Sequence, residues 1–191
     1  MINKVAVFAS GKGSNADNIC RYFKHHATIR VDCILSDRKA AGVFQVAADH
    51  QVPAFYLSKE LLQQPQAILA ILRSQQINFI VLAGYLKLMP LEIISVYKKR
   101  IINIHPALLP KYGGKGMFGM FVHEAVHNAD EAETGITIHH VNEHYDKGDI
   151  IFQTKVKVEK TDTPHSIASK IHDLEIKYYP KVIEETVLAN N

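Results

Sequence analysis

The sequence has few of the features that mark secreted, membrane-bound or nucleic-acid-binding proteins. It holds two cysteines, and no apolar run is long enough to span a bilayer. Cys20 and Cys33 lack metal or redox spacing, which indicates a reducing compartment and buried apolar roles. The formal net charge of +3 suits anionic small molecules but is too small for a nucleic-acid-binding surface. Because a strand pattern begins almost at the first residue, we expect no signal peptide and a cytoplasmic protein without membrane or nucleic-acid partners.

What the sequence does contain is the composition of an ordinary globular protein. Hydrophobic residues make up 47% of the chain and charged residues 21%, and no segment is compositionally biased. A chain of 191 residues is long enough to bury a substantial core and suits one domain. We therefore expect a single domain over residues 1–191.

Strand and helix patterns alternate through the first half of the chain. Apolar runs bounded by turn residues predict strands at 4–10, 29–36, 52–57, 78–83 and 101–105. Helical patterns lie between them, one including residues 19–23 and others at 42–50, 65–75 and 90–99. This alternation predicts an α/β fold with a doubly wound, mostly parallel sheet of the Rossmann-like kind.

The second half of the chain departs from this alternation. Residues 135–141 and 150–158 alternate as strands with only a turn between them, which predicts antiparallel pairing. A long final helix is expected at 164–188, with Thr163 as its cap. We expect its apolar residues to face the core, namely Ile167, Ile171, Leu174, Tyr178 and Val182.

A glycine turn follows the first predicted strand. Gly11 and Gly13 allow the backbone to approach an anion, Ser14 or Asn15 can cap the next helix, and the exposed helix amides face the ligand. A dinucleotide-binding site requires a third glycine close to the first two. The chain has none near this turn, and Asn18 lies closer to the turn than the next glycine does. The loop therefore favours a phosphomonoester, although a glycine turn that merely joins a strand to a helix is the alternative.

The strand at 101–105 ends at His105-Pro106, where proline stops the sheet ladder. Period two places Asn103 and His105 on one face at the carboxyl end, where open parallel sheets bind ligands. An amide and an imidazole there can stabilise an oxyanion and move a proton, whereas the alternative is a hydrogen-bonded structural histidine. Asp146, on a tight loop, can orient that histidine or can simply be a turn residue.

Three further segments can complete a ligand site. Leu86, Leu88 and Met89 follow the strand at 78–83 and can form the wall for a flat aromatic ligand or belong to the core. Glu175 on the last helix can reach the ligand. Residues 113–122 are too rich in glycine and methionine for regular structure, and we expect them to form a mobile flap over the site.

A short metal-binding pattern also occurs in the chain. His123 and His127 fit H-E-x-x-H, which on a helix can present two zinc ligands, and Glu143 offers a third. The pattern is short and lies in an α/β sheet protein with a phosphate loop. We therefore favour a surface helix with one histidine turned toward the site, and no metal, over a zinc peptidase.

Taken in order, these motifs resemble the phosphoribosylglycinamide formyltransferases, a group of 10-formyltetrahydrofolate enzymes. The resemblance covers nearly the whole chain and rests on residues 10–15, 103–106, 108–112, Gly135 with His139, 146–148, and Glu175 before 179–180. The chain departs from the family pattern in a longer flap, with Gly113 where proline usually follows Tyr112. Lys87 stands where arginine is common, and Ala107 where serine is common.

The resemblance implies an activity and a role for each site residue. A formyl group would pass from 10-formyltetrahydrofolate to the amine of glycinamide ribonucleotide in purine biosynthesis. The implied catalytic group is Asn103, His105 and Asp146, with Asp146 keeping His105 protonated. The phosphoribosyl group would lie on Gly13, Ser14, Asn15 and Glu175, and the folate on Leu86, Lys87, Leu88, Met89, Asn103 and Asp146.

The resemblance also implies a division of the domain and a set of partners. Residues 1–100 would bind phosphate, and residues 101–191 would carry catalysis and bind folate. The expected partners are the small-molecule substrates, with no metal, and the chain would be a monomer or homodimer. Alternatives are another 10-formyltetrahydrofolate enzyme, such as a hydrolase or a methionyl-tRNA formyltransferase, or a non-catalytic module that binds a phosphorylated metabolite.

Overall fold

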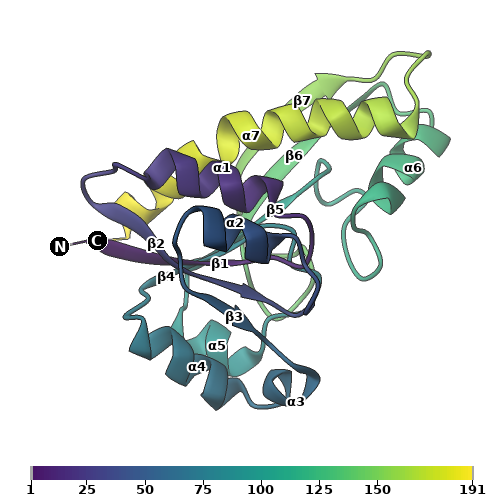
Figure 1. Ribbon diagram of the computed structural model, residues 1–191. Helices are drawn as coiled ribbons and strands as arrows, with labels where there is room; N and C mark the ends of the chain where they lie inside the picture. Colours follow the sequence, from purple (N-terminus) through teal and green to yellow (C-terminus); the bar gives the residue numbers. More distant parts are fainter. Residues whose placement is uncertain (1, 191) are drawn as a thin grey trace.

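The computed structural model describes residues 2–190, which form a mixed sheet covered by helices on both faces (Figure 1). The strands are β1 (Asn3–Phe8), β2 (Ile29–Ser36), β3 (Ala54–Tyr56), β4 (Phe79–Leu82), β5 (Ile101–His105), β6 (Glu133–His140) and β7 (Ile150–Lys157). The helices are α1 (Ser14–Phe23), α2 (Val43–Asp49), α3 (Lys59–Leu62), α4 (Pro65–Ser74), α5 (Leu91–Val96), α6 (Met120–Asn128) and α7 (Pro164–Ala189). The short helix α3 had no counterpart in the sequence analysis.

The sheet has the order β3-β2-β1-β4-β5-β6-β7. The first five strands in this order are parallel, while β6 is antiparallel to β5 and β7 is antiparallel to β6. The predicted fold class, including the late antiparallel strands and the long last helix, is confirmed. The strand order reverses between β1 and β4, and in sheets of this kind such a reversal opens a crevice at the carboxyl edge.

Each face of the sheet has its own hydrophobic core, because side chains alternate along a strand. Val5 and Val7 of β1 belong to the core under α1, α2 and α7. Ala6 and Phe8 belong to the opposite core under α4 and α5. Figure 1 shows these two groups of helices on opposite faces of the sheet. Both faces are therefore covered, which explains why the central strands are almost continuously apolar.

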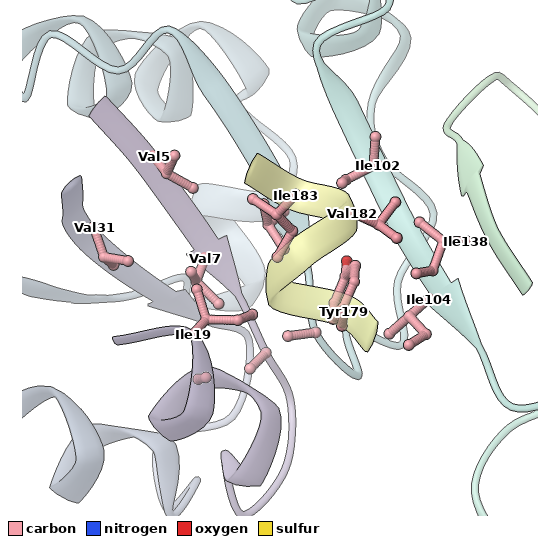
Figure 2. Packing of buried hydrophobic residues seen from close by; sticks show 14 of the residues in the cluster. Val5, Val7, Ile19, Val31, Ile102, Ile104, Ile138, Tyr179, Val182 and Ile183 are labelled. Carbon is pink, nitrogen blue, oxygen red and sulfur yellow. The ribbon is translucent and has the colours of Figure 1, made fainter. Parts of the chain in front are cut away.

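The last helix crosses the sheet and carries a large part of the first core. Thr163 caps it as predicted, its side chain accepting from the Ser166 N–H at 3.2 Å. Figure 2 shows Tyr179 and Ile183 of this helix packed among strand residues. The expected inward residues all belong to this core or pack against it, Leu174 and Tyr178 being partly buried, and Tyr179, which was not expected there, is fully buried.

Two loops meet at the carboxyl edge of the sheet. The Ser10 N–H after β1 donates to the Gly84 carbonyl after β4 at 3.0 Å, and Ser10 Oγ accepts from the Leu86 N–H at 3.0 Å. These bonds hold the glycine loop and residues 84–89 side by side. Within residues 2–190, no helix is both long and apolar enough to cross a membrane.

Candidate active site

A cavity of about 650 Å³ opens at the carboxyl edge of β1, β4 and β5. The structure brings all of the sequence-predicted site residues to its lining, namely Gly13, Ser14, Asn15, Leu86, Lys87, Leu88, Met89, Asn103, His105, Asp146 and Glu175. His123 and His139 line it as well. Groups far apart in the chain therefore line one open cavity.

The glycine loop shapes one end of this cavity. Gly13 has a φ of +90°, and a β-carbon there would lie 2.9 Å from Val43 Cα, so this turn requires glycine. The predicted capping by Ser14 or Asn15 is wrong, because Gly13 itself is the N-cap of α1 and no side chain caps the helix. The Asn15 side chain instead donates to Glu175 Oε2 at 2.8 Å. The first amides of α1 thus have no side-chain cap and lie beside the cavity, as an anion site requires.

His105 ends β5 and is 3% exposed. Its Nε2 lies 2.8 Å from the Tyr112 carbonyl oxygen, so Nε2 carries a proton and donates. Its Nδ1 lies 3.5 Å from Asp146 Oδ1. The imidazole is therefore held by one nitrogen and turns the other toward the carboxylate.

The ionisation of His105 differs from the sequence-based expectation. Burial lowers the pKa of His105 below its usual 6.5, and the charge of Asp146, which acts to raise it, does not compensate. Asp146 thus acts in the expected direction on the pKa of His105, but burial has the larger effect in the protein without ligands. At neutral pH the imidazole is neutral, with Nδ1 free to accept a proton.

Asp146 is fixed by groups on both sides. Its Oδ2 accepts the Gly114 N–H at 2.8 Å, and its Oδ1 also lies 3.6 Å from His139 Nε2. Burial acts to raise the pKa of Asp146, but His139, the proximity of His105 and the Gly114 amide together hold it below the usual 3.8. Asp146 is therefore a carboxylate throughout the physiological pH range.

Asn103 is oriented by a histidine that sequence reasoning did not assign to the catalytic group. His139 of β6 donates from Nδ1 to the His140 carbonyl oxygen at 2.8 Å, which leaves Nε2 as an acceptor 3.2 Å from Asn103 Nδ2. One N–H of the Asn103 amide is thereby engaged and the other remains for a ligand. The register of β5 and β6, which pairs Asn103 with His139, brings the two side chains together, and the sequence alone does not give this register.

The loop after β4 combines core and cavity surfaces. Met89 is 2% exposed and packs in the core with Tyr85 and Ile93, whereas Leu88 is 43% exposed and Lys87 is exposed. All of Leu86–Met89 line the cavity. The core interpretation therefore holds for Met89, whereas Leu88 is exposed at the cavity and its role as a ligand wall stays a prediction.

The predicted flap lies along the same cavity. Residues 114–119 line it without helix or strand structure, while α6 begins at Met120, so the flap is shorter than the expected 113–122. Gly114, Gly116 and Gly119 have positive φ, which glycine adopts readily. The hydrogen bond from the Gly114 N–H joins the flap to the Asp146 carboxylate.

The H-E-x-x-H pattern falls on α6. His123 is 6% exposed and lines the cavity, whereas His127 and Glu143 are exposed. Among residues 2–190 no group of three or more histidine, cysteine, aspartate or glutamate side chains is placed to hold a metal ion. The structure therefore places only one histidine of this pattern at the site.

The low pKa of His105 leads to a first prediction. In a histidine-labelled NMR titration, His105 should titrate below 6.5, and Asp146→Asn should lower its pKa further because the favourable carboxylate charge is lost. Glu92→Gln, an exposed change on α5, should leave the midpoint unchanged. A His105 midpoint above 6.5, or one that rises in Asp146→Asn, would contradict this assignment of the charge states.

Gly148 gives a second prediction, because it packs against the backbone that holds His139. A β-carbon at Gly148 would overlap the His140 carbonyl oxygen, which accepts the His139 Nδ1–H. We expect Gly148→Ala to reduce the free energy of unfolding by about 1–3 kcal/mol, the usual cost of overpacking. Denaturant titration measures this, with Gly11→Ala as the control, since a β-carbon there meets nothing within 4 Å. Equal stability of the two variants would refute the argument.

Comparison with known proteins identifies the family of the chain. Residues 3–183 match the formyl transferase family. The chain is 35% identical over 195 residues to the phosphoribosylglycinamide formyltransferase of Bacillus subtilis, covering all of this chain and 97% of that one. It is 38% identical over 187 residues to the chloroplastic phosphoribosylglycinamide formyltransferase of Arabidopsis thaliana, covering 94% of this chain and 64% of that protein. The chain spans 60% of the length of a second plant relative, the chloroplastic phosphoribosylglycinamide formyltransferase of Vigna unguiculata.

Solved structures agree as well. The glycinamide ribonucleotide transformylase 1 of Geobacillus kaustophilus superimposes with a TM-score of 0.89 at 34% identity, covering 98% of this chain and 100% of that one. The phosphoribosylglycinamide formyltransferase of Bacillus halodurans gives a TM-score of 0.86, also at 34% identity, covering 96% and 94%. The chain belongs to the formyl transferase family.

Proposed function

We propose that this chain transfers a formyl group from 10-formyltetrahydrofolate to the primary amine of glycinamide ribonucleotide, a step of purine biosynthesis. The observation that carries the proposal is the convergence of Asn103, His105 and Asp146 on a cavity whose other end is the glycine loop. The names of the bacterial relatives, which the chain covers almost completely, support the same reaction.

Each substrate has a matching part of the cavity. The phosphate of the acceptor would lie on the loop at Gly13 and Ser14, with Asn15 and Glu175 beside its sugar. The folate would lie against Leu86–Met89, where apolar side chains and the exposed Lys87 suit a flat ring system with carboxylates. The formyl carbon would then meet the acceptor amine beside His105.

The reaction needs one proton to leave the attacking amine and one to reach N10 of the folate. The amine attacks the formyl carbon, and the carbonyl electrons move to oxygen, where the free N–H of Asn103 donates to the oxyanion. Nδ1 of His105 takes the amine proton, and Asp146 stabilises the resulting imidazolium. The oxyanion electrons then re-form the carbonyl, the bond from carbon to N10 breaks, and His105 gives the proton to N10. No metal takes part in this scheme.

The proposal also covers the roles of the two halves of the chain, its assembly and its cellular compartment. Residues 1–100 would supply the phosphate site, and residues 101–191 the catalytic group and most folate contacts, within one domain. The partners would be small molecules, with a monomer or homodimer as the working assembly. Cys20 and Cys33 are separate, buried free thiols, which suits a reducing compartment such as the cytoplasm.

The proposal is tested by incubating the protein with both substrates and analysing the products by mass spectrometry. We expect formylglycinamide ribonucleotide and tetrahydrofolate in equal amounts. Release of formate without the acceptor would instead indicate a hydrolase. Binding of both ligands without any product would indicate a non-catalytic module, and either result would overturn the proposed function.

A further inference from the structure

Ser10 is a buried polar residue between the glycine loop and the loop after β4. It lies two residues beyond the end of β1 and is 2% exposed, and the lining of the cavity begins at the next residue, Gly11. A buried hydroxyl is tolerated where its hydrogen bonds are satisfied, so the partners of Ser10 show which parts of the chain it connects.

The partners of Ser10 follow two other strands of the sheet. Its Oγ donates to Asp37 Oδ1 at 2.5 Å and accepts from the Leu86 N–H at 3.0 Å. Its own N–H donates to the Gly84 carbonyl at 3.0 Å. Asp37 comes directly after β2, and Gly84 and Leu86 follow β4. One residue therefore joins three loops at the carboxyl edge of the sheet.

The two loops on either side of Ser10 line different parts of the cavity. Residues 11–15 follow Ser10, and residues 86–89 begin at the leucine whose amide Ser10 holds. Within the described residues 2–190, both hydrogen bonds between segments 10–15 and 84–89 are made by Ser10. The distance between these two walls of the cavity therefore depends on this serine.

Asp37 fixes the orientation of the Ser10 hydroxyl. A hydroxyl has one proton to donate, and a carboxylate is a strong acceptor for it. With that proton directed to Asp37, the oxygen of Ser10 remains an acceptor for the Leu86 N–H. Asp37 is partly buried and reaches the cavity walls only through Ser10.

We propose that Ser10, oriented by Asp37, is a positioning residue that sets the distance between the acceptor amine and the formyl carbon. It acts through the loops that hold the two substrates and touches neither substrate itself. Reacting atoms attack from about 3–3.5 Å, and a displacement of about 1 Å can cost on the order of 100-fold in rate. This inference rests on the proposed function, because it requires two substrates bound side by side.

A bisubstrate adduct, in which a folate analogue is joined through one carbon to the amine of glycinamide ribonucleotide, senses this distance. Ser10→Ala should weaken binding of the adduct about 10- to 100-fold in calorimetric titrations. Glycinamide ribonucleotide alone and the folate analogue alone should each bind within about threefold of the wild type, because each contacts only one loop. At saturating substrates kcat should fall about as much as the affinity for the adduct.

Asp37→Ala tests the same contact at a partly exposed position and decides the proposal if Ser10→Ala does not fold. It should weaken the adduct about three- to tenfold, the scale of one hydrogen bond, and leave the single ligands unchanged. Because Asp37 acts through Ser10, the double variant should bind the adduct no more weakly than Ser10→Ala does.

Thr186→Val is the matched control for loss of a buried hydroxyl. Thr186 is 8% exposed, and its Oγ1 donates to the Val182 carbonyl within α7, so no loop of the cavity is involved. We expect Thr186→Val to lose some stability in denaturant titration and to keep its affinity for the adduct and its kcat.

Two results would overturn the role of Ser10. One is an unchanged affinity for the adduct in Ser10→Ala or, if that variant does not fold, in Asp37→Ala. The other is a loss of affinity for one single ligand as large as the loss for the adduct, which would mean that Ser10 shapes only one of the two walls.

The same titrations separate this proposal from the proposed function. If the wild type binds both ligands and transfers no formyl group, the proposed function fails, while the adduct comparison still decides the role of Ser10. If formyl transfer occurs but the variants bind the adduct as tightly as the wild type, only the role of Ser10 fails.

Discussion

His105→Ala is expected to lower kcat for formyl transfer by about 10³- to 10⁴-fold, the upper part of the range for a positioned acid–base group. In the proposed mechanism Nδ1 of His105 takes the amine proton and passes it to N10, and alanine offers no substitute. The KM values should change little, because His105 is nearly enclosed and its other nitrogen is bound to the Tyr112 carbonyl. Single-turnover kinetics with both substrates measure the effect on chemistry directly.

His105→Ala also removes the hydrogen bond from His105 to the Tyr112 carbonyl. A matched variant, His105→Gln, separates the effect of losing this bond from the effect of losing the proton acceptor. In His105→Gln the side-chain amide can still donate to the Tyr112 carbonyl, but it cannot accept and return a proton. We expect His105→Gln to fold as stably as the wild type and to be as inactive as His105→Ala. Activity of the glutamine variant within tenfold of the wild type would mean that His105 only supports the loop.

The parts of the fold that the sequence predicts well are those governed by local pattern. β1, β4 and β5 can be predicted from their apolar runs, because strands buried on both faces are apolar throughout. The antiparallel β6 and β7 follow from alternation with only a turn between them. Period two then places Asn103 and His105 on the cavity side of β5, as the structure has them.

The errors arise where a distant contact decides between local alternatives. Tyr179 was not expected in the core, yet it is fully buried and its hydroxyl donates to the Leu82 carbonyl at 2.8 Å, a contact between residues 97 positions apart. Asn15 fits a helix cap by type, yet its amide reaches Glu175 across the cavity. Neither preference is visible without the tertiary structure.

The charge state of His105 was missed for a similar reason. A carboxylate beside a histidine normally favours the imidazolium, and the family resemblance implied that Asp146 would do so. The depth of burial at the end of β5 is a property of the whole fold, and at 3% exposure it outweighs the carboxylate. The histidine is therefore ready to accept a proton before it donates one.

Asp146→Asn should lower kcat by at least about 100-fold, while both substrates bind nearly as in the wild type. Asparagine has almost the same shape and can keep the contact of a side-chain oxygen with the Gly114 N–H. It removes the negative charge that lies 3.5 Å from His105 Nδ1, and with it the stabilisation of the imidazolium formed during the reaction. Steady-state kinetics, together with calorimetric Kd values for each substrate, measure the two effects separately.

Asp149→Asn is the control for Asp146→Asn, because Asp149 is an exposed carboxylate just before β7. It should leave kcat within about twofold, since exposed charges interact weakly through water. If Asp146→Asn also turned over within a few-fold of the wild type, Asp146 would have no role in the proton transfer. If it lost substrate affinity instead of kcat, its contact with Gly114 would matter for closing the flap rather than for the chemistry.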